Sequence, residues 1–318
     1  MLTIDVPAWV LYGAGLALCL LLACLWNRSL GRRLLLFAPA AALLGVLGAH
    51  LLMSLCTFQD TLNYYSQGHF PGYAFLTFWD GRYMMWGGIL GVWLAVFLCF
   101  PKGQRKQAAD SFAPFGILAV GFVRLIQGLQ GGFYFKEIPY VDEWEEVYDP
   151  RFDHFPWSVA DQDYGTQQWS LFLVAVLAAL VIFLLLLPKG KGHAPGDRTL
   201  RFFGLYGAVT VILESMRRDE VIKWGFIRCS QIFAAIVVLL VLMLYWKRAA
   251  GKQLSRRIWA LGLYFLCVGI CLVMEFATEQ RIAFLAEILS PDQCYAVSAM
   301  GALGMAGSVY WMRSAEKQ

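Results

Sequence analysis

Hydrophobic residues form long uninterrupted runs along this chain, and polar residues collect in the segments between them. A helix that crosses a bilayer needs roughly 20 predominantly apolar residues, because each residue adds about 1.5 Å along the helix axis. Nine runs approach that length, and each predicts a membrane-spanning helix. They are Trp9–Trp26, Leu34–Leu55, Tyr83–Phe100, Ser111–Leu129, Trp169–Leu187, Leu200–Met216, Phe226–Trp246, Ile258–Met274 and Cys294–Trp311.

The segments between the runs predict how the chain is oriented. The stretches "NRSLGRR", "PKGQRK", "PKGKGHAPGDRTLR" and "KRAAGKQLSRR" are basic, and they fall on one side if all nine helices cross. Short cytoplasmic loops keep an excess of lysine and arginine, so that side is predicted to be the cytoplasm. The N-terminus is then outside, the C-terminus is cytoplasmic, and loops 56–82 and 133–168 face outward. The second loop carries nine acidic and two basic residues.

The composition agrees with an all-α, polytopic helical membrane protein. Hydrophobic residues make up 59% of the 318 residues and charged residues only 15%. The formal net charge of +4 follows from the basic cytoplasmic loops, so we expect no nucleic-acid partner. The eight cysteines form no CxxC motif or Cys/His cluster with metal-ligand spacing, and we expect no metal site.

Polar side chains inside the runs are the candidate functional residues. An ionisable group near the membrane centre costs at least about 2.5 kcal/mol unless it is paired or hydrated. With the predicted orientation, six such residues lie toward the outer ends of their helices and are expected to converge. They are His50, Arg124, Gln127, Gln130, Glu214 and Gln231. Arg124, Gln127 and Gln130 follow one another at intervals of three, which places them along one face of a helix.

Purely structural roles are open for the same residues. Glutamines in membrane helices often serve only as hydrogen-bond links between helices, and an arginine near a helix end often reaches the interface. Glu214 is spaced to pair with Arg217 or Arg218 on the next helical turn. A functional role for Arg124 would be phosphate binding, because a guanidinium presents a fork of donors that matches phosphate oxygens. The pattern therefore favours an outward cavity that holds an anionic phospholipid head group.

The chain resembles the phosphatidylglycerol prolipoprotein diacylglyceryl transferases of bacteria over roughly residues 1–247. Segments that resemble family motifs occur in the family's order: "WVLYGAGLAL", "LGAHLLMSL", "FWDGRYMMWGGILGV", "VRLIQGLQGG", "YGTQQWS", "LYGAVTVILESMRR" and "SQIFA". The order and spacing of these segments carry the resemblance. It divides the chain into a seven-helix transferase-like domain, residues 1–247, and a two-helix C-terminal extension, residues 248–318.

The resemblance implies a function and a set of residues. Such enzymes transfer diacylglycerol from phosphatidylglycerol to the lipobox cysteine thiol of a prolipoprotein signal peptide, at the outer face of the bacterial cytoplasmic (inner) membrane, without metal or cofactor. The implied partners are therefore phosphatidylglycerol, the prolipoprotein and the surrounding membrane lipids. Implied catalytic residues are Arg124, Glu214 and Tyr206. Implied substrate-binding residues are Tyr12, Trp86, Gly87, Gly88, Gln127, Gln130, Gln167, Arg217 and Gln231.

Four positions depart from the family pattern. Trp86 stands where the family has a histidine, Thr210 where it has an arginine, Gly132 where it has a glutamate, and Tyr164 where it has a histidine. An indole has only an N–H donor and accepts no proton from a thiol. We therefore expect His50 to serve as an alternative base, and Arg228 as an alternative phosphate ligand.

Three functions remain open from the sequence. The first is a divergent diacylglyceryl transferase. The second is a non-catalytic relative that binds phospholipid or a lipoprotein partner. The third is a polytopic transporter-like protein, since ionisable residues in membranes also mark transport paths.

Overall fold

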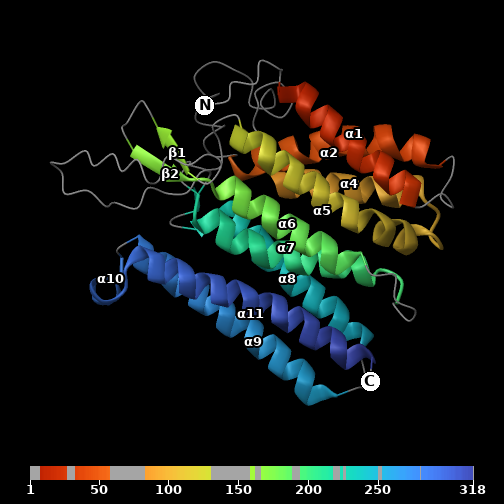
Figure 1. The fold of residues 1–318 in the computed structure, drawn as a ribbon. Helices are drawn as coiled ribbons and strands as arrows, with labels where there is room; N and C mark the ends of the chain where they lie inside the picture. Colours follow the sequence, from red (N-terminus) through yellow and green to blue (C-terminus); the bar gives the residue numbers. More distant parts are fainter. Residues whose placement is uncertain are drawn as a thin grey trace, which may run out of the picture. The chain divides into compact units, whose positions relative to one another are not determined.

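The hydrophobic runs form helices in the computed structural model of the protein (Figure 1). The structure describes residues 8–26, 33–57, 83–129, 158–161, 166–187, 194–217, 223–224, 227–249, 253–279 and 281–317. Within these ranges, every predicted span overlaps a helix. The helices are α1 (Ala8–Trp26), α2 (Arg33–Cys56), α4 (Met85–Cys99), α5 (Arg105–Leu129), α6 (Leu171–Leu186), α7 (Asp197–Ser215), α8 (Cys229–Arg248), α9 (Leu254–Thr278), α10 (Ala283–Ile288) and α11 (Pro291–Lys317).

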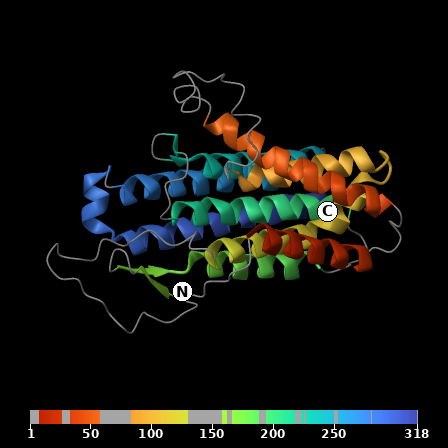
Figure 2. The same cartoon turned by 90° about the horizontal axis from the view of Figure 1, so that it is seen from above.

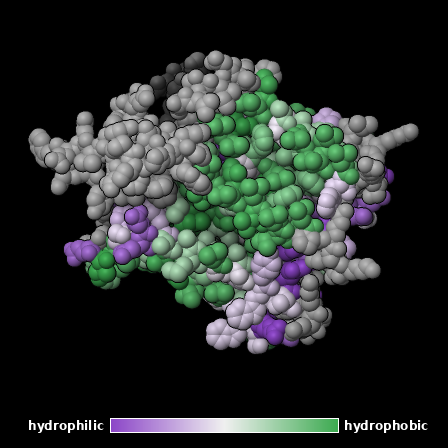
Figure 3. Space-filling view, in the orientation of Figure 1, coloured by the Kyte–Doolittle hydropathy of each residue, from purple (hydrophilic) through white to green (hydrophobic). Residues whose placement is uncertain are grey.

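The protein is a polytopic helical membrane protein. Among the described residues, α2, α5, α8 and α9 are long and apolar enough to cross a membrane, and α1, α4 and α6 are shorter apolar helices. Helix α6 exposes Val174, Leu177, Val181 and Leu184 at intervals of three and four, which forms an apolar stripe suited to lipid. Hydrophobic residues cover much of the face seen in Figure 3. Membrane crossing by α7 and α11 stays a prediction.

The chain divides into two compact units, and the borders between them fall within α1, α5, α6 and α7. One unit comprises residues 1–16, 117–185 and 201–318, and we call it the arginine unit because it holds Arg124, Arg217 and Arg228. The other comprises residues 17–116 and 186–200, and we call it the α2–α4 unit. The C-terminal extension expected from the sequence lies wholly in the arginine unit.

Within the α2–α4 unit, α2 and α4 pack closely because glycines line their contact. A methyl group added at Gly87 would overlap the carbonyl oxygen of Gly48, and one added at Gly91 would overlap that of Leu44. Small residues let membrane helices approach closely in this way. Asp110 of α5 caps the start of α7 in the same unit, accepting from the Gly196 N–H at 2.6 Å and the Thr199 N–H at 2.9 Å.

Within the arginine unit, α9 and α11 lie side by side, and both contact α8 (Figures 1 and 2). Glycine again sets the spacing, since a methyl group added at Gly204 of α7 would lie 2.9 Å from the Val309 side chain of α11. The short helix α10 falls in the segment between the last two predicted spans.

Two short hairpins, which the hydrophobic pattern did not predict, also belong to the arginine unit. Strand β1 (Ser158–Asp161) pairs with β2 (Thr166–Trp169) in an antiparallel ladder, with Ser158 opposite Trp169. Strand β3 (Lys223–Trp224) pairs with β4 (Ile227–Arg228) between α7 and α8. The second hairpin ends directly at the start of α8, and it therefore determines where Arg228 enters that helix.

Candidate functional site

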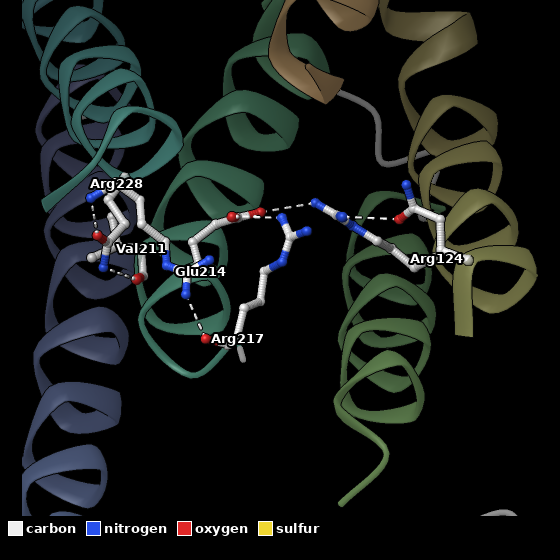
Figure 4. Close-up of polar contacts among 7 residues, drawn as sticks. Arg124, Val211, Glu214, Arg217 and Arg228 are labelled. Carbon is white, nitrogen blue, oxygen red and sulfur yellow. Dashed lines mark hydrogen bonds and ion pairs between the residues drawn. The ribbon is translucent and has the colours of Figure 1, made fainter. Parts of the chain in front are cut away.

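The centre of the site is Glu214 of α7, which binds two guanidinium groups. Arg124 of α5 donates to its Oε1 at 3.0 Å, and Arg217 donates to its Oε2 at 2.8 Å (Figure 4). Only 2% of the Glu214 side chain is exposed, so both ion pairs form in a poorly hydrated place. Of the two partners that the sequence left open for Glu214, Arg217 pairs with it, and Arg124 joins from a position 90 residues away. We call Arg124, Glu214 and Arg217 the arginine–glutamate cluster.

Gln127 extends the cluster along α5. Its Oε1 accepts a hydrogen bond from Nη1 of Arg124 at 3.0 Å, across the interval of three that the sequence indicated. Gln127 and Glu214 thus hold two nitrogens of the same guanidinium, and this fixes its plane. Gln130 lies outside the described residues.

The start of α8 reaches the cluster from the other side of α7. Gln231 accepts from the backbone N–H of Arg228 at 2.9 Å and donates to the carbonyl oxygen of Val211 at 3.2 Å (Figure 4). Gln231 therefore caps α8 and links it to α7, which is the structural role that the sequence left open. Arg228 is 1% exposed, and its Nη2 donates to the carbonyl oxygen of Arg217. A phosphate contact from Arg228 stays a prediction.

A small pocket adjoins the cluster between α5, α6 and α7. Its polar lining consists of Arg124, Tyr206, Thr210 and Glu214, and apolar side chains of the three helices form the remainder. Tyr206 is buried and stacks on Phe202, with ring centroids 5.9 Å apart. The lining thus brings charged groups next to hydrocarbon. A phospholipid has the same division between head group and acyl chains.

Thr210 shows what replaces the family's second arginine. Its hydroxyl donates to the carbonyl oxygen of Tyr206 at 2.8 Å, one turn back along α7. The group is thus satisfied within its own helix and supplies no positive charge. Tyr12, a surviving family residue on α1, interacts electrostatically with Arg124 in the same unit.

The expected base and the glycine motif belong to the α2–α4 unit. His50 is 2% exposed, and its Nε2 lies 3.4 Å from the Ser54 hydroxyl. Trp86 is 1% exposed at the start of α4. Gly87 has a packing role against α2, and substrate binding by Gly87 and Gly88 stays a prediction.

The remaining candidates lie partly or wholly outside the described residues. Gln167 belongs to β2, where its backbone pairs with Ala160. Gly132 and Tyr164 are not described. Among the residues that are described, no group of three or more His, Cys, Asp or Glu side chains is placed to hold a metal ion.

One acidic residue of this region is not among the candidates predicted from the sequence. Glu275, near the end of α9, is 5% exposed and accepts a hydrogen bond from the hydroxyl of Ser215, the residue after Glu214. Its only signal in the sequence is its place directly after the apolar run that ends at Met274. An acid at the edge of a run is common at membrane surfaces, so its burial was not expected.

Comparisons with known proteins agree with the resemblance seen in the sequence. The family model described as prolipoprotein diacylglyceryl transferase matches residues 7–247. The phosphatidylglycerol–prolipoprotein diacylglyceryl transferases of three strains of Vibrio cholerae serotype O1 are each 27% identical over 195 residues. That alignment covers 58% of this chain and 66% of each relative, so the chain spans just under two thirds of their length. No solved structure matches the chain.

Proposed function

Since the chain belongs to the prolipoprotein diacylglyceryl transferase family, we propose that it transfers diacylglycerol from phosphatidylglycerol to the lipobox cysteine thiol of a prolipoprotein. The observation that carries the proposal is the arginine–glutamate cluster beside a pocket with apolar walls. The charged groups of the cluster match the phosphate of phosphatidylglycerol, and the apolar walls match its two acyl chains.

The charge of the cluster fits a phosphodiester. Arg124 and Arg217 carry two positive charges and Glu214 one negative charge, which leaves a net charge of +1. The phosphodiester of phosphatidylglycerol carries a single negative charge, so the complex would be neutral. Glu214 accepts one N–H from each arginine. It thereby orients both groups in the manner of a preorganised anion site.

The transfer would proceed by displacement at the carbon of diacylglycerol that carries the phosphate. A carbon–sulfur bond to the cysteine forms, the carbon–oxygen bond to the phosphate breaks, and the thiol proton passes to a base. Glycerol phosphate leaves with one more negative charge on its phosphate than the diester had. Arg124 and Arg217 would stabilise this growing charge more strongly than the ground state, which is how such groups accelerate a reaction. His50 stays the base predicted from the sequence.

A second candidate function is supported by the departures from the family pattern. Trp86 offers no acceptor for a thiol proton, and the Thr210 hydroxyl is used within α7. Losing a positioned base costs about 10² to 10⁴ in rate. A relative that binds phospholipid or a lipoprotein without turnover would retain the cluster and the pocket while losing these groups.

The orientation of the chain follows from the basic loops. We place the N-terminus and loops 56–82 and 133–168 outside the bacterial cytoplasmic membrane and the C-terminus in the cytoplasm. All nine predicted spans must cross for this arrangement. It puts the outer end of α5, where Arg124 and Gln127 lie, on the side where prolipoproteins emerge.

One experiment tests the function and separates the two candidates. Purified protein is incubated with phosphatidylglycerol and a peptide that carries a lipobox cysteine, and released glycerol phosphate is measured. We expect release from the wild type and a loss of at least about 100-fold in Arg124→Ala, since removal of one oxyanion-stabilising donor costs this much. Arg256→Ala, a change of the same type at the start of α9, is the control and should retain wild-type release.

The outcomes have distinct meanings. Release that Arg124→Ala lowers and Arg256→Ala leaves intact supports the transferase. Phosphatidylglycerol that copurifies with the wild type in an Arg124-dependent way, without release, supports the non-catalytic relative. A protein that shows no release and no Arg124-dependent lipid binding would contradict both candidate functions.

A further inference from the structure

The C-terminal extension packs directly on the helices that carry the arginine–glutamate cluster. Gly204 of α7 meets Val309 of α11 closely, and the Tyr264 hydroxyl of α9 donates to the carbonyl oxygen of Ala235 in α8 at 2.7 Å. Each contact joins a residue within the family match, which covers residues 7–247, to a residue of the extension. The extension is therefore in a position to act on the site, and nothing in the family assignment gives it a role.

Two acidic residues near the end of α9 reach the connection between α7 and α8. Glu275 accepts a hydrogen bond from Ser215, and Glu279, one turn later, pairs with Lys223 of β3 at 3.4 Å. Arg217 and Arg228 flank this connection. Glu275 thus contacts Ser215, which lies between Glu214 and Arg217 in the sequence.

Glu275 and Arg228 are both deeply buried, and they share a neighbourhood. Their exposed fractions are 5% and 1%. The charges of both groups, and that of Glu279, act on the phenol of Tyr295 in α11, which is also buried. A buried carboxylate and a buried guanidinium that act on the same phenol contribute opposite charges to this part of the protein.

We propose that Glu275 of the C-terminal extension is a positioning residue of the phosphate site, which sets the net charge around the arginine–glutamate cluster and so selects phosphodiester lipids over phosphomonoester lipids. This inference rests on the proposed function, because it assumes that the cluster receives a lipid phosphate. Glu275 acts through Ser215 and Arg228 and does not itself touch the lipid.

The charge count gives the direction of the effect. Three guanidiniums, Arg124, Arg217 and Arg228, face two carboxylates, Glu214 and Glu275, and the sum is +1. Without Glu275 the sum would be +2, which suits a dianion. A phosphodiester carries one negative charge, whereas a phosphomonoester carries nearly two above its second ionisation at about pH 6. Glu275 therefore favours a lipid whose phosphate is esterified on both sides, as in phosphatidylglycerol.

The test measures a ratio of two affinities. Binding of phosphatidylglycerol and of phosphatidic acid with identical acyl chains is measured at pH 8 in detergent by native mass spectrometry. Glu275→Gln should raise the affinity for phosphatidic acid relative to phosphatidylglycerol about tenfold, the effect of one extra charge at about 10 Å in a medium of dielectric about 20. Glu275→Asp, which retains the charge, should keep the wild-type ratio. Glu287→Gln, at an exposed acid of α10, is the matched control and should also keep it.

Two further variants keep the test decisive if Glu275→Gln does not fold. Ser215→Ala removes the hydrogen bond without changing the charge, and it should weaken both lipids equally. The double variant Arg228→Gln/Glu275→Gln restores the sum of +1 and should return the wild-type ratio. A double variant that instead disfavours phosphatidic acid, or a Glu275→Gln protein with the wild-type ratio, would overturn the inference.

Failure of the proposed function would look different. A wild type that binds neither lipid contradicts the phosphate site itself. A wild type that binds phosphatidylglycerol through Arg124, with a ratio that does not respond to Glu275, contradicts only the role of the extension.

Discussion

Glu214→Gln tests how much the two ion pairs of the arginine–glutamate cluster contribute to stability. The substitution preserves shape, but it replaces one of two acceptor oxygens with an N–H donor and removes the charge that two arginines share. Arg124 and Arg217 contact Glu214 at 3.0 and 2.8 Å, and 2% of its side chain is exposed. Removing one partner of a buried ion pair costs about 3–5 kcal/mol, because the remaining charge is left uncompensated. Since two charges are left here, we expect a loss near 5 kcal/mol in the free energy of unfolding.

The assay is unfolding of the purified protein in mixed micelles with increasing sodium dodecyl sulfate, followed by tryptophan fluorescence. Glu287→Gln, the same substitution at an exposed site, should change the free energy of unfolding by less than about 0.5 kcal/mol. Arg124→Gln combined with Glu214→Gln removes one of the two stranded charges and should recover part of the loss. Added phosphatidylglycerol should stabilise Glu214→Gln more than the wild type, because a phosphate would replace the missing anion.

A Glu214→Gln protein whose free energy of unfolding lies within about 0.5 kcal/mol of the wild-type value would contradict this prediction. The two ion pairs would then contribute nothing to the folded state, and a preorganised arginine pair could not be claimed. An equal response of wild type and variant to phosphatidylglycerol would separately contradict phosphate binding at the cluster.

Further predictions concern the fold around the site. Gly87→Leu should destabilise the protein by about 1–3 kcal/mol or more in the same unfolding assay, because its side chain would overlap the Gly48 backbone of α2, whereas Gly103→Leu, in open space, should not. Asp110→Ala removes the cap at the start of α7 and should cost about 1–2 kcal/mol, and Asp110→Asn should recover part of it. For the orientation, a cysteine at Asp142 should react with a membrane-impermeant maleimide in intact cells, and one at Lys191 only after lysis; the reverse pattern would invert the topology.

The helices could be predicted from the sequence because a lipid environment leaves few alternatives. A run of about 20 apolar residues has to satisfy its backbone internally, and a helix does so within the run itself. The Glu214–Arg217 pair could be predicted as well, since it depends only on spacing along one helix. The convergence expected for polar residues in different spans holds for Arg124 and Glu214.

The rest of the site depends on contacts that spacing does not determine. Ser215 meets Glu275 across 60 residues, and the pairing requires the C-terminal ends of α7 and α9 to lie close together. The interpretation of Gln231 was open for the same reason, because a glutamine in a membrane helix binds a ligand or a neighbouring backbone equally well in chemical terms. Its bond to the Val211 carbonyl is a matter of which helices pack together, and this arises from shape complementarity along their whole length.

In the proposed site, the guanidinium fork of Arg124, held by Glu214, binds the phosphate of phosphatidylglycerol. The most direct measurement is the affinity for phosphatidylglycerol, against the uncharged lipid diacylglycerol with the same acyl chains, in the wild type and in Arg124→Lys. Lysine keeps the charge but lacks the fork, so we expect a preference for phosphatidylglycerol in the wild type that falls at least about tenfold in the variant. Equal preference in both proteins, or none in the wild type, would contradict it.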